Sequence, residues 1–152
     1  MEILRIENLS FTYPLAEHTA LESVSFSVRQ GEFVVLCGGT GCGKTTLLRL
    51  IKRELAPHGT RTGNVFLHDA PMDTLDARAS AAEIGFDMQN PENQIVTDKV
   101  WHELAFGAES LGLPTQVIRR RVAETASWLG IEGWFRQDTD TLSGGQKQLL
   151  NL

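Results

Sequence analysis

A glycine-rich loop between an apolar run and a helical pattern constrains the fold of this chain more than any other feature. Residues Gly38–Thr45 read GGTGCGKT and fit the pattern G-x-x-x-x-G-K-[ST] at every fixed position. The run Glu32–Cys37 before the loop is almost wholly apolar, which is typical of a strand buried on both faces. After the loop, apolar residues recur at helical spacing at Leu47, Leu48, Ile51 and Leu55. Strand, glycine loop and helix in this order predict an α/β fold with a phosphate-binding loop.

Each part of this loop has a physical role in binding a polyphosphate. Glycines let backbone N–H groups approach a phosphate closely, and the start of the following helix adds the positive end of its dipole. We expect Lys44 to contact the β- and γ-phosphates, the Thr45 hydroxyl to bind Mg²⁺ and Thr46 to donate toward the α-phosphate. The predicted nucleotide-binding set in the loop is Gly38, Gly39, Thr40, Gly41, Cys42, Gly43, Lys44, Thr45 and Thr46.

Composition and charge exclude several other classes of function. The chain has 152 residues, 41% apolar and 22% charged, which suffices for a globular domain with its own core. A net charge of −5 argues against general nucleic-acid binding, because the basic run Arg119–Arg121 spreads over different faces of a helix. Two cysteines and four scattered histidines give no metal-site spacing. No apolar stretch approaches the ~20 residues of a membrane span and no basic-then-apolar leader opens the chain, so we expect a cytoplasmic protein.

The first part of the chain is predicted to be rich in β structure. Apolar residues are spaced by two at Leu4 and Ile6 and then at Leu9, Phe11 and Tyr13. Val24–Val28 alternates apolar and small polar residues, as a half-buried strand does. Residues 58–80 read as loops around one short strand, Val65–Leu67, and Ile84–Phe86 is expected to be another core strand.

The second part is predicted to be helical. Apolar stripes indicate helices over about residues 98–111 and from Thr115 to Leu129, and Ser143 begins a last helix. We therefore expect a β-rich core subdomain over residues 1–91 and a helical subdomain over residues 92–152.

A second motif, LSGGQ at Leu142–Gln146, begins that last helix. Ser143 and Gln146 fit a capping box, so a well-capped helix alone is one interpretation. The consecutive glycines Gly144 and Gly145 each weaken a first helical turn by about 1 kcal/mol relative to alanine. They also leave bare backbone where an anion can approach closely, which favours a binding function.

With this pentapeptide downstream of Lys44, the sequence resembles the nucleotide-binding domain of ATP-binding cassette (ABC) proteins. The resemblance covers the chain from Glu2 onward. It implies an α/β P-loop NTPase fold of the ABC type, with a core subdomain that carries the glycine loop and a helical subdomain that carries the pentapeptide, called the signature below. It also implies ATP and Mg²⁺ as cofactors, and a head-to-tail pair with a second ABC ATPase domain. The signature residues would then serve ATP bound to that second subunit: Ser143, Gly144, Gly145 and Gln146.

The same resemblance assigns roles to two residues outside the motifs. Tyr13 matches an aromatic residue that stacks on adenine, with core packing at a strand end as the alternative. Gln89 matches a glutamine that reaches Mg²⁺ and the attacking water. The resemblance therefore implies catalytic roles for Gln89 and Lys44, and Thr45 and Gln89 as ligands of Mg²⁺.

The stretch Gln89–Gly107 is more specific, because it closely resembles the ATPase subunits of energy-coupling factor importers for vitamins and cobalt. In that group this region forms a groove for a coupling helix of the transmembrane subunit. Trp101 and Phe106 are candidates for the groove, with core packing as the alternative. The resemblance implies a peripheral ATPase on the cytoplasmic face of the membrane, with a transmembrane coupling subunit and a substrate-binding membrane subunit as partners. The sequence is compatible with a homodimer and with pairing to a related ATPase.

The family's second acidic motif, an apolar strand ending in Asp-Glu, does not follow the signature in this sequence, nor does the switch histidine. The segment Val65–Asp69 is similar, but it precedes Gln89 and has Ala70 in place of the glutamate. We therefore expect the C-terminal part of the core to be missing. Without those acids Mg²⁺ is held less firmly and no group polarises the water, so residues 1–152 should barely hydrolyse ATP, although the parent would be an ATPase.

Three alternatives compete with this interpretation. A non-transport ABC ATPase of DNA repair or chromosome structure would carry a long coiled coil between Lys44 and Ser143, and the spacing leaves no room for one. If the chain were a small P-loop kinase, its match to the signature would be accidental. A nucleotide-binding fragment without hydrolytic activity would act as a binding module only.

Overall fold

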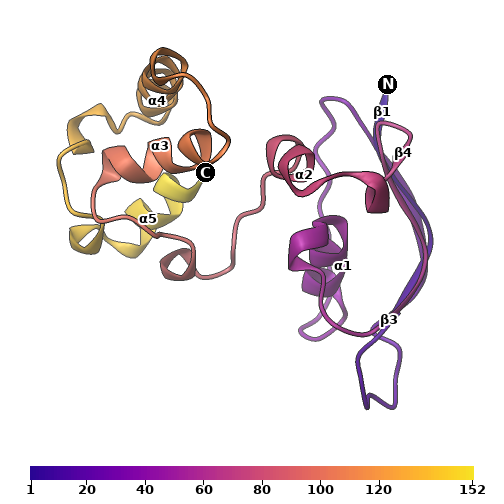
Figure 1. Ribbon diagram of the computed structural model, residues 1–152. Coiled ribbons are helices and arrows are strands. Elements are labelled where there is room, and N and C mark those ends of the chain that lie inside the picture. Colours follow the sequence, from indigo (N-terminus) through magenta and orange to yellow (C-terminus); the bar gives the residue numbers. More distant parts are fainter. The chain divides into compact units, whose positions relative to one another are not determined.

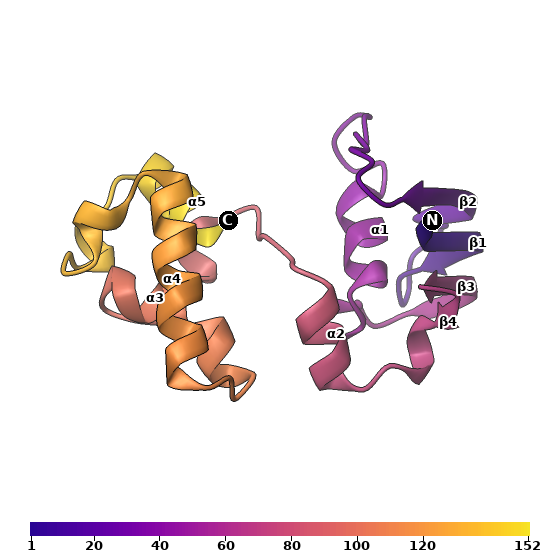
Figure 2. The ribbon, with the colours of Figure 1, turned by 90° about the horizontal axis from the view of Figure 1, so that it is seen from above.

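The computed structural model describes all residues, Met1–Leu152, and they form two compact units, Met1–Ile84 and Gly85–Leu152. The first unit is a curved antiparallel sheet with helices on one side, and the second is a cluster of helices joined by turns (Figure 1; Figure 2). Each unit has a hydrophobic core of its own.

The sheet of the first unit has four strands in the order β2-β1-β3-β4, and all neighbours are antiparallel. The predicted alternation in the first two strands and at Val65–Leu67 is confirmed, although these three strands are longer than predicted and the fourth strand was not predicted. The strands are β1 (Glu2–Thr12), β2 (Leu21–Arg29), β3 (Thr60–Leu67) and β4 (Ala70–Pro71).

A bulge in β1 explains a break in the alternation of its apolar residues. Ile6 and Leu9 are both fully buried although they are an odd number of positions apart. Between them Asn8 has a left-handed backbone with φ 48°, and the pairing of β1 shifts register at this point with both β2 and β3. Opposite Asn8, a Cβ on Gly63 would lie 2.3 Å from the Asn8 carbonyl oxygen, so only glycine fits there.

Helix α1 (Lys44–Ile51) covers the sheet and completes this core. Leu47 and Leu50 are buried with Ile6, Leu9 and Phe11, which confirms the predicted helix after the glycine loop. The helix ends earlier than predicted, because Lys52 adopts an extended backbone and a 3₁₀ turn follows at Arg53–Leu55. Leu48, which the helical spacing placed in the apolar stripe, is 45% exposed.

Helix α2 (Ala77–Glu83) was not predicted, and its first part lies in residues 58–80, where the sequence predicted loops. Asp76 is its N-cap and accepts a hydrogen bond of 2.6 Å from the Ala79 N–H. At the other end the Lys52 ammonium donates to the Ser80 and Ile84 carbonyls at 2.8 and 2.9 Å. Lys52 therefore ties the end of α1 to the end of α2.

Two predicted core strands do not form. Glu32–Cys37 and Ile84–Phe86 have no regular secondary structure, and neither segment pairs with any of the strands β1 to β4. In the first segment Phe33 is 90% exposed and Cys37 is exposed, so the prediction of a buried strand is wrong for this structure. The physical reason is that a strand buried on both faces needs neighbouring strands for its N–H and C=O groups, and none lies beside these segments.

The second unit consists of three helices and connecting turns. The helices are α3 (Val100–Ser110), α4 (Thr115–Leu129) and α5 (Gly144–Asn151), and all three were predicted. Gly130 ends α4 in a left-handed conformation at φ 70°, as a C-terminal glycine does. Two adjoining apolar clusters hold the helices together: Val100, Ala126, Ile131, Leu142 and Leu150, and Ala105, Ile118 and Val122.

None of the helices combines the length and the apolar character that crossing a membrane requires.

Candidate functional site

The glycine loop is seated on the backbone at the start of β2. Gly43 is the N-cap of α1 and has φ 91°, a conformation that residues with a side chain rarely adopt. A Cβ at this position would lie 2.5 Å from the Ala20 carbonyl oxygen and 2.9 Å from Leu21 Cδ2. The close approach fixes where the loop ends and where α1 begins.

The side chain of Lys44 crosses the loop from which it projects. Its ammonium donates to the Gly38 and Gly39 carbonyls, both at 2.8 Å, and lies 3.4 Å from Cys42 Sγ. The loop therefore surrounds a cation with backbone groups, and an anion that approaches the loop meets this charge.

The start of α1 is not capped by any side chain. Gly43 has no side chain to accept a hydrogen bond, and the first turn contains no acidic residue. The N–H groups of this turn and the positive end of the helix dipole are thus available to a ligand beside Lys44. Thr45 is exposed at this end, whereas Thr46 is buried against the core.

Tyr13 follows β1 directly and reaches α1. Its ring packs edge to face on the buried Phe11, with centroids 4.9 Å apart and an interplanar angle of 87°. Its hydroxyl lies 2.9 Å from Thr46 Oγ1, a contact that sequence reasoning missed. Tyr13 is still 38% exposed, so part of the ring can receive another ring beside the phosphate loop.

Behind the loop, Lys52 and Glu54 form a polar cluster that the sequence did not predict. Burial disfavours the ionised form of Glu54, but hydrogen bonds from its backbone N–H and from Ser80 Oγ, the latter at 2.8 Å, outweigh this, and the pKa of Glu54 lies below its usual range. The Lys52 ammonium is 3.8 Å from the same carboxylate. The cluster holds the far end of α1 in place through Ser80 and Ile84.

The signature lies in the second unit and starts α5 as predicted. Ser143 Oγ accepts from the Gln146 N–H at 3.3 Å, and Gln146 Oε1 accepts from the Ser143 N–H at 2.8 Å. This confirms the capping box, and it means that the Gln146 amide oxygen serves its own helix. Gly144 and Gly145 stay exposed, with no atom within 4 Å of an added Cβ.

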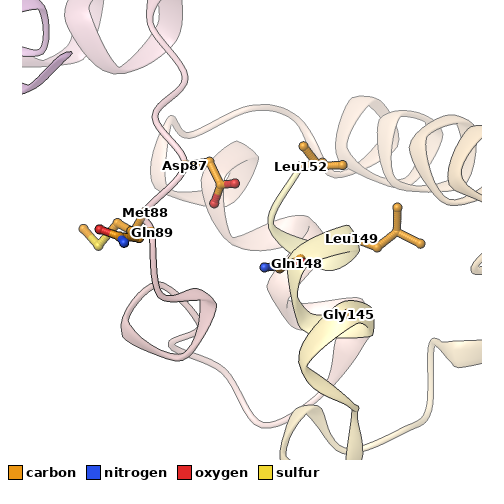
Figure 3. A pocket seen from close by; sticks show the side chains of 7 residues that line it. All are labelled: Asp87, Met88, Gln89, Gly145, Gln148, Leu149 and Leu152. Carbon is orange, nitrogen blue, oxygen red and sulfur yellow. The ribbon is translucent and has the colours of Figure 1, made fainter. Parts of the chain in front are cut away.

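Gln89 and Gly145 line one open hollow of about 550 Å³ in the second unit. Figure 3 shows the Asp87 side chain directed to the side of α5, whereas those of Met88 and Gln89 point the other way. The Gln94 side-chain oxygen accepts from the Met88 N–H at 2.8 Å and thereby holds this segment. Asp87 is a carboxylate for which the sequence predicted no role, although it lies two residues before Gln89. The residues that line the hollow are Asp87, Met88, Gln89, Gly145, Gln148, Leu149 and Leu152.

The two candidates for the predicted groove differ in their surroundings. Trp101 packs edge to face on Phe135, with centroids 5.4 Å apart, and with Phe135 it also lines a hollow of about 490 Å³ beside His102. Phe106 is 45% exposed on α3. At the edge of this hollow the Asp138 carboxylate, 2.6 Å from the Lys99 ammonium, raises the pKa of Lys99 above its ordinary value.

Comparison with known proteins decides the family. Residues 21–152 match the family profile described as "ABC transporter". This chain belongs to the ABC transporter family. The ABC chain is 50% identical over 147 residues to a putative ABC transporter ATP-binding protein of Bacillus thuringiensis subsp. konkukian. The aligned region covers 97% of the chain and 27% of that relative. It is 39% identical over 153 residues to the cobalt import ATP-binding protein CbiO of Syntrophus aciditrophicus, covering 99% of the chain and 53% of that protein.

Solved structures give the same fold. The structure of cbiO1 from Clostridium perfringens, described as part of the ABC transporter complex cbiONQ, matches with a TM-score of 0.83 and 29% identity over 99% of the ABC chain and 59% of that chain. A dimeric ATP-binding cassette bound to ADP and Pi matches with a TM-score of 0.79 and 24% identity, which is a likeness of fold alone. The predicted α/β P-loop fold of the ABC nucleotide-binding domain is thereby confirmed. The ABC chain spans between about a quarter and a half of the curated relatives named above.

Proposed function

We propose that this ABC chain binds Mg-ATP through its glycine loop and Tyr13, as the ATP-binding part of a membrane importer of the energy-coupling factor type. The observation that carries the proposal is the uncapped start of α1 with the Lys44 ammonium enclosed in the loop beside it. A polyphosphate is the ligand that uses both features, because its oxygens accept from several N–H groups and its charge pairs with the lysine.

Each residue of the first unit has one task in this proposal. Lys44 binds the β- and γ-phosphates, Thr45 at the exposed first turn of α1 binds Mg²⁺, and Thr46 donates toward the α-phosphate. The exposed part of the Tyr13 ring receives the adenine. The backbone N–H groups of Gly38–Gly43, with those of Lys44 and Thr45, surround the phosphates.

The signature in the second unit supplies the residues that act on ATP bound to a second cassette. Gly144 and Gly145 present exposed backbone at the start of α5, where a γ-phosphate can approach the N–H groups. The capping box keeps this turn in shape and uses Ser143 Oγ and Gln146 Oε1 as acceptors. The hydroxyl proton of Ser143 and the side-chain N–H groups of Gln146 remain to donate to the ligand. Gln89 serves as the glutamine that senses Mg²⁺ and the attacking water, and a neutral amide binds and releases both without a charge penalty.

The importer type is supported by the stretch Gln89–Gly107 and by the likeness to CbiO and to cbiO1. The partners in this proposal are a second ABC ATPase, a transmembrane coupling subunit and a substrate-binding membrane subunit, so the chain works at the cytoplasmic face of the membrane. The half-buried Trp101 and the exposed Phe106 on α3 are the side chains offered to the coupling subunit.

Residues 1–152 by themselves bind nucleotide and hydrolyse it slowly in this proposal. They contain no Asp-Glu pair at the end of an apolar strand after the signature. Asp69, in the similar segment Val65–Asp69, lies next to β4 and is 3.8 Å from Arg5, so it is part of a surface ion pair. Efficient transfer of the γ-phosphate to water needs an acidic group that polarises the attacking water, and the family resemblance places that group in the Asp-Glu motif.

Isothermal titration with Mg-ATP, together with a phosphate-release assay, tests the proposal. Wild-type chain should bind Mg-ATP, Lys44→Ala should weaken binding at least about 100-fold because a charge-assisted contact to phosphate is lost, and phosphate release should stay near background. Lys147→Ala, at a lysine that pairs with Glu92 in the second unit, is the matched control and should bind as the wild type does. Equal affinity of the wild type and Lys44→Ala would refute the proposed site.

A further inference from the structure

We propose that Tyr13 is also a positioning residue for the phosphate end of the site, acting through Thr46; the inference rests on the proposed function. Stacking on a base accounts for the ring of Tyr13 and leaves its hydroxyl without a task. That hydroxyl lies 2.9 Å from Thr46 Oγ1 on the first turn of α1.

Both partners of this hydrogen bond are held by the core. The Tyr13 ring packs on Phe11, which is 1% exposed, and Thr46 is 7% exposed on the face of α1 that contacts the sheet. The structure gives the Thr46 hydroxyl no hydrogen bond other than that to Tyr13. The bond therefore joins the end of β1 to the start of α1.

The bond orients the Thr46 hydroxyl. A threonine in a helix divides its population between two χ1 rotamers, because its hydroxyl can also bond to a carbonyl one turn back. A phenol is a better donor than an aliphatic alcohol, so Tyr13 donates and Thr46 accepts. The proton of Thr46 is then left for a phosphate oxygen, and a hydroxyl that already accepts a hydrogen bond is a stronger donor.

Affinity for a ligand without a base separates this role from stacking. Mg-tripolyphosphate has neither adenine nor ribose, so Tyr13 can influence its binding only through the protein. Tyr13→Phe keeps a ring that stacks and packs on Phe11 but removes the hydroxyl. The inference predicts that Tyr13→Phe weakens Mg-ATP and Mg-tripolyphosphate by the same factor, about two- to twelvefold, which is the range for one neutral hydrogen bond.

A double-mutant cycle tests whether Tyr13 influences phosphate binding through Thr46. Thr46→Val should weaken both ligands by at least as much as Tyr13→Phe, and adding Tyr13→Phe to Thr46→Val should change nothing further. In Thr46→Ser, which keeps a hydroxyl, Tyr13→Phe should again weaken both ligands. If the Tyr13 hydroxyl only stabilised the fold, Tyr13→Phe would lower the midpoint of urea unfolding. Its effect on ligand affinity would then be the same whichever residue stands at position 46.

Binding of Mg-ATP to the wild type and its weakening by Lys44→Ala are measured first, because a wild type that does not bind would refute the proposed function itself. Once that binding is established, an unchanged affinity of Tyr13→Phe for Mg-tripolyphosphate would overturn the inference and leave the proposed function standing. Effects of Tyr13→Phe and Thr46→Val that simply multiply would overturn it as well, because the two residues would then act independently.

Discussion

Replacing Gly43 by alanine tests most sharply whether close contact with the Ala20 backbone positions the phosphate loop. Gly43 has φ 91°, and its missing side chain faces the Ala20 carbonyl oxygen at 2.5 Å. The same loop contains a matched control in Gly41, which has φ 83° and no atom within 4 Å of an added Cβ. The two alanine variants therefore share the conformational cost and differ in the clash.

The structure allows the two costs to be separated. A left-handed conformation costs a residue with a Cβ about 1–2 kcal/mol, so Gly41→Ala should lose about that much unfolding free energy. In Gly43→Ala the distance of 2.5 Å must grow by 0.9 Å to reach the ordinary contact of 3.4 Å, and the opposing atom is backbone. Such overpacking adds about 1–3 kcal/mol, which gives a total of about 2–5 kcal/mol for Gly43→Ala.

Hydrogen exchange of peptides from β1, β2 and α1 measures the loss of stability in the elements that surround the loop. Exchange in these peptides should accelerate more in Gly43→Ala than in Gly41→Ala, and Mg-ATP affinity should fall with it, because the start of α1 has to shift. Peptides from the second unit serve as an internal reference, as does the fluorescence of Trp101, Trp128 and Trp134, which all lie there. Equal effects of the two variants would refute the claim that contact with the Ala20 carbonyl seats the loop.

Three further predictions follow from other contacts. Lys52→Met removes two charge-assisted hydrogen bonds to carbonyls and should lower the unfolding free energy of the first unit by about 2–4 kcal/mol in urea titrations; a loss below about 0.5 kcal/mol would show that α1 and α2 are not joined there. Ser143→Ala removes the N-cap of α5 and should cost about 1 kcal/mol, visible as faster hydrogen exchange in the first turn of α5, whereas unchanged exchange would contradict the capping role. Because the pKa of Glu54 is lowered from 4.5, its contribution to stability is complete above that pH and is lost as the pH falls through the lowered value; Ser80→Ala should reduce this acid dependence, and an identical pH profile would contradict it.

Features that depend on local sequence were predicted well. The apolar stripe of α4, with Ile118, Val122 and Ala126 one turn apart, gave the bounds of that helix, because helical spacing needs no partner to be recognised. The capping box at Ser143 was equally local, since its two hydrogen bonds close within one turn.

Features that depend on distant neighbours were not predictable in the same way. The run Glu32–Cys37 has the composition of a buried strand, but a strand forms only where another strand accepts its hydrogen bonds, and none lies beside it. The hydrogen bond between Tyr13 and Thr46 joins the end of β1 to α1, and no spacing in the sequence encodes it. One signal was present for Thr46: it precedes Leu50 by one helical turn and so shares the buried face of α1.

Hydrogen exchange of the wild-type chain with and without Mg-ATP tests the central claim most directly, because it locates the ligand on the backbone. The account predicts slower exchange of the amides of Gly39–Thr46, together with the segment that carries Tyr13, and no such protection in Lys44→Ala. Protection that falls on other segments, or that persists in Lys44→Ala, would contradict the assignment of this loop as the nucleotide site.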